Sequence, residues 1–197
     1  MKPATCFFIA FICLFIQKGY TQRNYVKGFI IGLPFQSGAV IANAGFEHLT
    51  ATRTASWQLS INFAAGELGN DAGTTNRKWI TIDRNYYFKN TSDFSNALFV
   101  SFFIETGTRA RSPGMRFIFG DSILKKRNAV ELNPGIGIGR NFSLGKKWHM
   151  QLVGAPKAII AFHKDNYYDI SSKTYFDKKY NDLSAGYRLL IAFCYQL

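Results

Sequence analysis

The feature that most constrains this chain is an alternation of apolar and polar residues that recurs in segment after segment. In Trp57–Gly66 the odd positions are apolar and the even ones polar or small, whereas in Val130–Gly139 the even positions are apolar. A period of two residues is typical of a β-strand whose two faces meet different surroundings. The pattern predicts eight such strands, at residues 24–35, 38–50, 55–67, 77–89, 97–110, 127–141, 147–163 and 181–197.

The connections between the predicted strands alternate in length. Those near residues 52–54, 90–96 and 142–146 are short, and those near 67–76, 111–126 and 164–180 are longer. The first connection, at 35–37, is short and departs from the alternation. Short periplasmic turns and long extracellular loops alternate in outer-membrane barrels. The predicted fold is therefore all-β, an eight-stranded antiparallel up-and-down transmembrane β-barrel with both termini in the periplasm.

The start of the chain has the character of an export signal. Lys2 is followed by the unbroken apolar run Cys6–Ile16 and then by the small residues Gly19 and Thr21. That run is shorter than the roughly 20 residues that a membrane-spanning helix needs. We therefore predict a signal peptide at residues 1–21 and an outer-membrane β-barrel domain at residues 22–197. Removing the signal would leave Cys194 as the one cysteine, so no disulfide or cysteine metal site is expected.

The chain is strongly basic, with a formal net charge of +12, which falls to +10 when Lys2 and Lys18 leave with the signal. For an exported barrel we expect the anionic partners to be outer-membrane lipid and lipopolysaccharide, and no nucleic acid. Aromatic residues make up 16% of the chain, which favours a lipid-facing surface with aromatic girdles.

The alternation assigns a face to each side chain. The predicted outward set is Trp57, Leu59, Ile61, Phe63, Ile80, Ile82, Leu98, Val100, Phe102, Ile104, Val130, Leu132, Ile136, Ile138, Leu189, Ile191, Phe193 and Tyr195. Arg84 also falls on the outward face, where its head would reach a membrane boundary. Pro134 falls outward inside a strand, which predicts a bulge or a local break.

The inward set carries charges of both signs, and these are the candidate site residues. They are Glu47, Asp83, Glu105, Glu131, Lys157 and Arg188. Such charges could form a proton or ion path, a site for a small ligand, or a packed ion-pair network. The interior of an eight-stranded barrel is just wide enough for side chains to fill, which favours the packed network. We expect Arg188 to pair with Glu47 or Glu131.

Catalysis and metal binding find little support in the sequence. Glu47 and His48 are adjacent, so within one strand they point to opposite faces. His149 and His163 lie near opposite ends of one predicted strand and cannot share a metal or a triad. The Gly135, Gly137 and Gly139 row has Ile between its glycines and lacks the strand–turn–helix context of a nucleotide loop. We expect no enzyme activity, no cofactor and no metal.

Two predicted loops have a composition that suits binding. A basic cluster in and beside the loop at 111–126 could contact lipopolysaccharide phosphates, or could be a solvated loop; it comprises Arg109, Arg111, Arg116, Lys125, Lys126 and Arg127. The loop at 164–180 holds five aromatic residues, which could contact protein or glycan, or could form a girdle at the membrane boundary.

Several short stretches carry a family resemblance. They are Ala44–His48, Arg84–Phe88, Asn133–Arg140 and Ala185–Arg188. With the strand pattern they resemble small eight-stranded outer-membrane barrels, such as the OmpX-like family and the OmpA transmembrane domain. They look closest to the outer-membrane β-barrel families of unknown function common in Bacteroidetes. The resemblance implies insertion by the barrel-assembly machinery, which reads the last strand, although that strand ends here in Leu197 rather than in an aromatic residue.

The expected role is that of a non-enzymatic outer-membrane barrel with a side-chain-plugged lumen, structural or engaged in surface interactions with an unidentified extracellular partner. Three alternatives stay open. A lipid-A-modifying enzyme would need a Ser/His/acid cluster at one rim. A narrow channel would conduct ions. A soluble periplasmic barrel of the lipocalin kind, which binds a small apolar ligand, would have the faces inverted.

Overall fold

The computed structural model describes residues 24–33, 39–50, 54–67, 74–88, 96–112, 118–119 and 122–197. They form nine strands: β1 (Asn24–Leu33), β2 (Ala39–Leu49), β3 (Ala55–Glu67), β4 (Thr74–Tyr87), β5 (Leu98–Ser112), β6 (Ile118–Phe119), β7 (Ser122–Ser143), β8 (Trp148–Asp169) and β9 (Thr174–Gln196). The predicted signal peptide at residues 1–21 and the first connection lie outside the described residues. Within the described ranges no helix is both long and apolar enough to cross a membrane.

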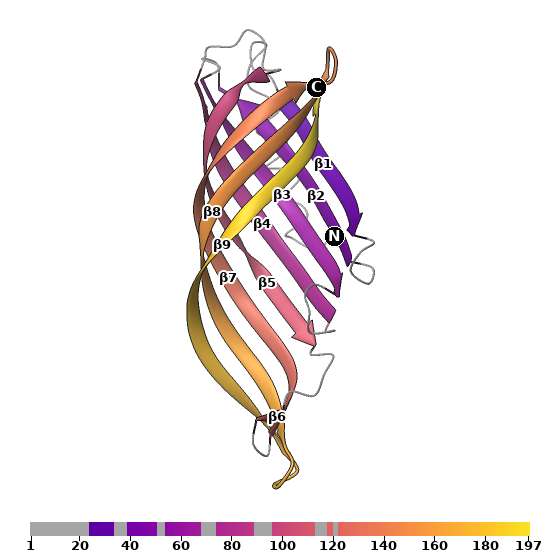
Figure 1. The fold of residues 1–197 in the computed structure, drawn as a ribbon, viewed down its shortest axis with the longest axis vertical. Coiled ribbons are helices and arrows are strands. Elements are labelled where there is room, and N and C mark those ends of the chain that lie inside the picture. Colours follow the sequence, from indigo (N-terminus) through magenta and orange to yellow (C-terminus); the bar gives the residue numbers. More distant parts are fainter. Residues whose placement is uncertain are drawn as a thin grey trace, which may run out of the picture.

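Eight of the strands form a closed antiparallel ring. Each of β1 to β4 pairs with the next, β5 pairs with β7, β7 with β8 and β8 with β9, and β9 pairs back with β1 (Figure 1). Among the described residues, the two-residue β6 pairs with the start of β7, outside the ring. The predicted eight-stranded antiparallel β-barrel is therefore confirmed.

The strand register keeps like residues on one face all round the ring. Leu59 pairs with Ile82 and Ile82 with Ile104, while Gln58 pairs with Asp83. The first three side chains point outward and the last two point into the lumen. Apolar side chains on the outer face are 41–85% exposed; they include Trp57, Ile61, Ile80, Ile82, Phe102, Ile104, Val130, Leu132, Ile136, Ile138, Phe162, Leu183, Tyr187, Leu189 and Phe193. We call this set the apolar belt; the predicted assignment of faces is confirmed.

The two ends of the barrel differ. One end carries the turn 144–147 and the C-terminus, and we call it the turn end. At the other, the hairpin end, β7, β8 and β9 continue beyond β1 to β5, with the short β6 beside them (Figure 1). These three strands have 22, 22 and 23 residues, whereas β1 to β5 have 10 to 15. We call residues 122–128, 164–169 and 174–181 the projecting sheet.

The projecting sheet corrects the predicted strand limits. Most of the predicted loop at 164–180 is strand, joined by a turn at residues 170–173, and β7 begins at Ser122 rather than at residue 127. These residues extend past the belt, so both faces of the sheet carry polar side chains. Without one apolar face there is no alternation from which a strand could be predicted.

The prediction at Pro134 is met on one side of β7. The pairing Ile104↔Pro134 is part of an unbroken ladder with β5. Toward β8, the ladder passes from Leu132↔Ile160 to Gly135↔Lys157 with no pair at Asn133 or Pro134, so it has a local break there without an inserted residue. Proline lacks the backbone donor that a ladder pair needs. The register shift of β7 lies instead between Leu124 and Lys126, in the projecting sheet.

The seam that closes the ring is short. Among the described residues, Tyr25, Val26, Lys27 and Gly28 of β1 pair with β9, opposite Gln196 to Phe193. By contrast, β9 pairs with β8 from Thr174 to Tyr195. In the described structure the edge of β9 that faces β1 therefore has no ladder partner between Leu183 and Ala192, and Figure 1 shows β9 diverging from β1 there.

Candidate functional site

The lumen is lined by polar side chains, and the group nearest the turn end is organised by one buried ion pair. Lys27 on β1 contacts Glu47 on β2, and both side chains are fully buried. The Lys27 ammonium also donates to Gln58 Oε1 at 2.9 Å and to Gln151 Oε1 at 2.8 Å. Its three donors thus have three acceptors from three other strands.

The Glu47 carboxylate is held by several further donors. The Tyr87 hydroxyl donates to Glu47 Oε1 at 2.8 Å, the Asn85 amide donates to it at 3.3 Å, and the Ser56 hydroxyl also donates to it. A buried charge persists only when it is paired and hydrogen-bonded, and Glu47 meets both conditions.

A second group of charges lies farther along the lumen. Arg188 on β9 donates to Asp83 on β4 at 2.5 Å, across the barrel. Lys157 Nζ lies 2.6 Å from Glu105 Oε2, and Arg188 Nε lies 3.7 Å from Glu105 Oε1. The Arg188 guanidinium also lies 4.7 Å from the centre of the Phe103 ring, a cation–π contact. Strands β4, β5, β8 and β9 are therefore linked through their side chains as well as around the wall.

The third carboxylate of this group is Glu131. Arg77 contacts it at 2.9 Å and Arg109 at 3.0 Å, and the Arg77 guanidinium lies 3.8 Å from Glu105. These contacts form one connected network, in which each carboxylate contacts at least one cation. Its members are the carboxylates Asp83, Glu105 and Glu131 and the cations Arg77, Arg109, Lys157 and Arg188.

The structure places all six predicted lumen residues inside the barrel, but their predicted pairing is wrong. Arg188 binds Asp83 and Glu105, whereas Glu47 binds Lys27 and Glu131 binds Arg77 and Arg109. The alternation assigns a face but not a height along the barrel, and strand register and tilt decide which charges meet. Lys27 and Arg77 were missed. Arg77 shares the odd-numbered positions of Asp83 on β4, so the alternation itself could have identified it.

The predicted basic loop cluster is divided by the structure. Arg109 turns into the lumen toward Glu131, and Arg127 forms a two-pronged contact with Asp165, with nitrogen–oxygen distances of 2.9–3.1 Å. Arg111 is half-buried, Lys125 and Lys126 are exposed, and Arg116 lies outside the described residues. Arg109 and Arg127 are therefore already paired with carboxylates.

Asp165 centres a polar cluster in the projecting sheet that the sequence analysis did not identify. Its side chain is fully buried, and it accepts hydrogen bonds from the Tyr180 hydroxyl at 3.3 Å and the Tyr167 hydroxyl at 3.4 Å. Burial raises the pKa of both phenols; the Asp165 carboxylate adds to this rise, and Arg127 opposes it. Both hydroxyls therefore stay protonated and act as donors at neutral pH. The rings extend the cluster, since Tyr167 stacks on Phe176 and Tyr180 on His163.

Two of the three histidines lie near the turn end, on different faces of the wall, and the third lies near the hairpin end. His48 is on the outer side of β2, with Nδ1 2.8 Å from Asn24 Oδ1, and Glu47 faces the lumen as predicted. His149 packs edge-on against Tyr25 near the turn end, and His163 stacks on Tyr180 near the hairpin end. Among the described residues, no group of three histidine, cysteine or acidic side chains is placed to hold a metal ion.

Comparison with known proteins gives a likeness in fold. No protein-family model matches the chain, and no curated protein matches it. Among solved structures, the fold is similar to that of a major outer membrane protein from Thermus thermophilus. The TM-score is 0.56 at 10% sequence identity, over 90% of this chain and all of that one. At that identity the likeness establishes a shared barrel fold.

Proposed function

We propose that this chain is a resident outer-membrane β-barrel of a Gram-negative cell, non-enzymatic and plugged by its own lumen side chains, with a structural or surface-interaction role. The observation that carries the proposal is the distribution of polarity. An exposed apolar belt covers the outer face, while the charges inside are paired with one another. A barrel in lipid needs this arrangement, because only its outer face meets hydrocarbon. The fold that the chain shares with the Thermus outer membrane protein supports the same location.

The proposal includes how the protein reaches the membrane. Residues 1–21 would direct export, the barrel-assembly machinery would insert residues 22–197, and the turn end would face the periplasm. Affiliation with OmpX-like or Bacteroidetes barrels is part of the same proposal and rests on the sequence resemblance.

The alternatives are supported less well. A lipocalin-like soluble barrel needs an apolar interior, whereas the lumen here holds Lys27, Glu47, Asp83, Glu105 and Glu131. A lipid-modifying enzyme needs a nucleophile, a histidine and an acid at one rim, whereas Glu47 and its neighbour His48 lie on opposite faces of β2.

The decisive test is refolding of residues 22–197 into detergent, followed by electrophoresis with and without boiling and by flotation with liposomes. We expect a faster-migrating unboiled band and co-flotation, because a closed barrel resists detergent until it is heated. A protein that is monomeric in plain buffer, shows no heat shift and does not float would overturn the membrane assignment.

Two further tests address the plug and the surface partner. In planar bilayers the folded protein should carry no ionic current, and steady conductance would contradict a plugged lumen. For lipopolysaccharide, the described cations that support contact are Lys125 and Lys126, whose side chains are exposed; Arg116 belongs to the same proposal. A Lys125→Gln/Lys126→Gln variant should bind lipopolysaccharide vesicles several-fold more weakly at low salt, because each lysine near an anionic surface adds to the attraction. A Lys146→Gln/Lys147→Gln variant at the turn end is the matched control, and equal losses in both would contradict lipopolysaccharide contact at the hairpin end.

A further inference from the structure

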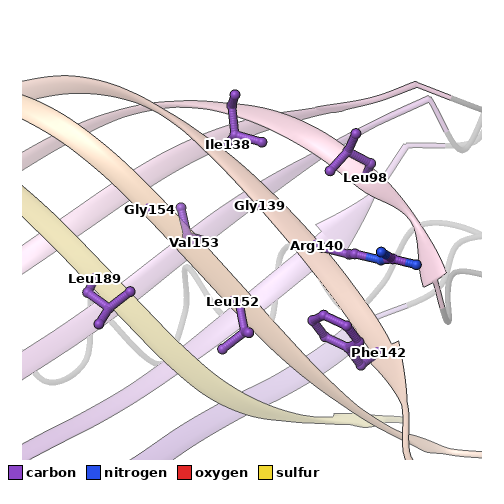
Figure 2. Close-up of a pocket in the computed structure, with 9 residues that line it drawn as sticks. All are labelled: Leu98, Ile138, Gly139, Arg140, Phe142, Leu152, Val153, Gly154 and Leu189. Carbon is purple, nitrogen blue, oxygen red and sulfur yellow. The ribbon is translucent and has the colours of Figure 1, made fainter.

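The belt is interrupted by a hollow on the outer face near the turn end. Its volume is about 210 Å³, and it lies across β5, β7, β8 and β9 (Figure 2). Its walls are aliphatic and come from Leu98, Ile138, Leu152 and Leu189. Ile138 and Leu189 are 63% and 74% exposed, so they form ridges rather than a cover.

The hollow exists because one outward position has no side chain. Gly154 on β8 lies between these ridges, and a Cβ built there would meet no atom within 4 Å. The volume is below the roughly 300–1,000 Å³ of sites for compact small molecules. An open apolar depression of this size on a barrel wall suits a length of alkyl chain.

A cation stands at one end of the hollow. Arg140 on β7 is exposed, and its guanidinium lies 5.3 Å from the centre of the Phe142 ring. Figure 2 shows the Arg140 side chain between Leu98 and Phe142, directed away from Gly154. This cation stands where the apolar wall ends, and a guanidinium fork matches the oxygens of a phosphate.

We propose that this hollow is a binding site for one anionic phospholipid, with an acyl chain lying over Gly154 and the phosphate on Arg140. The inference rests on the proposed membrane location, in which the turn end faces the periplasm and the hollow faces the inner leaflet of the outer membrane. The site commits to a diacyl lipid rather than to free phosphate, because the apolar hollow and the cation are contiguous.

The test uses the refolded full-length mature chain in detergent, titrated with dioleoylphosphatidylglycerol and followed by native mass spectrometry. Arg140→Gln removes the phosphate contact, and Gly154→Leu fills the hollow without meeting another atom at Cβ. Each should weaken binding of the most tightly retained lipid by about five- to tenfold, the effect expected for losing a charge-assisted contact or a buried chain segment. Ala44→Leu adds bulk at an exposed outward position on β2 and should bind as the unmodified protein does.

A second probe separates the two halves of the site. Diolein has the acyl chains without the phosphate, so Gly154→Leu should weaken its binding while Arg140→Gln should leave it unchanged. If Gly154→Leu binds phosphatidylglycerol as tightly as the unmodified chain, or if Ala44→Leu loses as much, the site is overturned. Should Gly154→Leu lose the heat-dependent gel shift, Gly154→Val takes its place with the same expectation.

The same samples distinguish failure of the site from failure of the proposed function. A protein that floats with liposomes and shifts on heating, yet shows no dependence on Gly154 or Arg140, overturns only the lipid site. A protein that neither shifts nor floats overturns the membrane assignment beneath it.

Discussion

At the scale of single residues, the Lys27–Glu47 pair is the most consequential feature of the lumen. Both side chains are fully buried, and together they contact five other side chains from three further strands. Removing one partner of such a pair leaves an uncompensated charge, which typically costs about 3–5 kcal/mol, whereas removing both can be nearly neutral.

We therefore expect Lys27→Met to lower the free energy of unfolding by about 3–5 kcal/mol. The double variant Lys27→Met/Glu47→Gln should recover more than half of that loss, because the amide oxygen of the substituted side chain still accepts from Tyr87 and Asn85. Urea titration in lipid vesicles, followed by gel mobility, measures both. A double variant as unstable as the single one would show that Lys27 acts through packing rather than through charge.

Two glycines provide a contrast at the same scale. A Cβ on Gly107 would lie 2.1 Å from the Lys78 carbonyl oxygen and 2.6 Å from Trp79 Cα, whereas one on Gly154 would meet nothing within 4 Å. Gly107→Ala should destabilise the barrel by about 1–3 kcal/mol, since the ladder must shift to admit a methyl group. Gly154→Ala should stay within about 0.5 kcal/mol of the parent. Equal stability of the two variants in urea would contradict this account of close approach at Gly107.

At the scale of elements, the seam between β1 and β9 is the weakest part of the wall. Between Leu183 and Leu190, β9 pairs with β8 on one side only, so alternate backbone amides have no ladder acceptor among the described residues. Opening a strand segment that is paired on both sides costs a free energy close to that of global unfolding, whereas a segment paired on one side opens more easily.

Hydrogen exchange of the folded protein in detergent should therefore be biphasic for peptides from residues 183–190, with about half of the amides exchanging fast. Peptides from residues 160–165 of β8, which pair with β7 on one side and β9 on the other, should exchange slowly throughout and provide the control. Uniform protection across residues 183–190 would mean that the seam is closed in solution.

The strands also show how far the sequence could be interpreted. Where one face of a strand contributes to the belt and the other lines the lumen, as at Trp57 and Gln58, the alternation predicted both the strand and the direction of its side chains. Around Lys164 and Lys179 both faces of the sheet are polar, so the alternation is missing there and the prediction of a loop was wrong.

The candidate site in the lumen shows what the alternation can and cannot predict. The alternation predicts which side chains point into the lumen. It does not predict that Arg188 pairs with Asp83, because that contact depends on the register of all the strands between them.

At the scale of the whole molecule, the proposed orientation puts the hairpin end outside the cell. The turn at residues 170–173 is exposed, and Cys194, the cysteine that would remain after signal removal, is buried. Ser171→Cys in intact cells should therefore react with a membrane-impermeant maleimide, whereas Lys146→Cys at the turn end should react only after lysis. The reverse pattern would invert the barrel in the membrane and move the lipid hollow to the outer leaflet.

The unequal strand lengths make the barrel rim slanted rather than level. The segment of β9 from Thr174 to Asn181 spans roughly 26 Å at about 3.3 Å per residue. The wall is therefore tall over β7 to β9 and low over β1 to β4. A crowded membrane could bring the low sides of two barrels together without a collision between their projecting sheets. A partner bound to the projecting sheet would lie to one side of the barrel axis, and it would approach from one direction only.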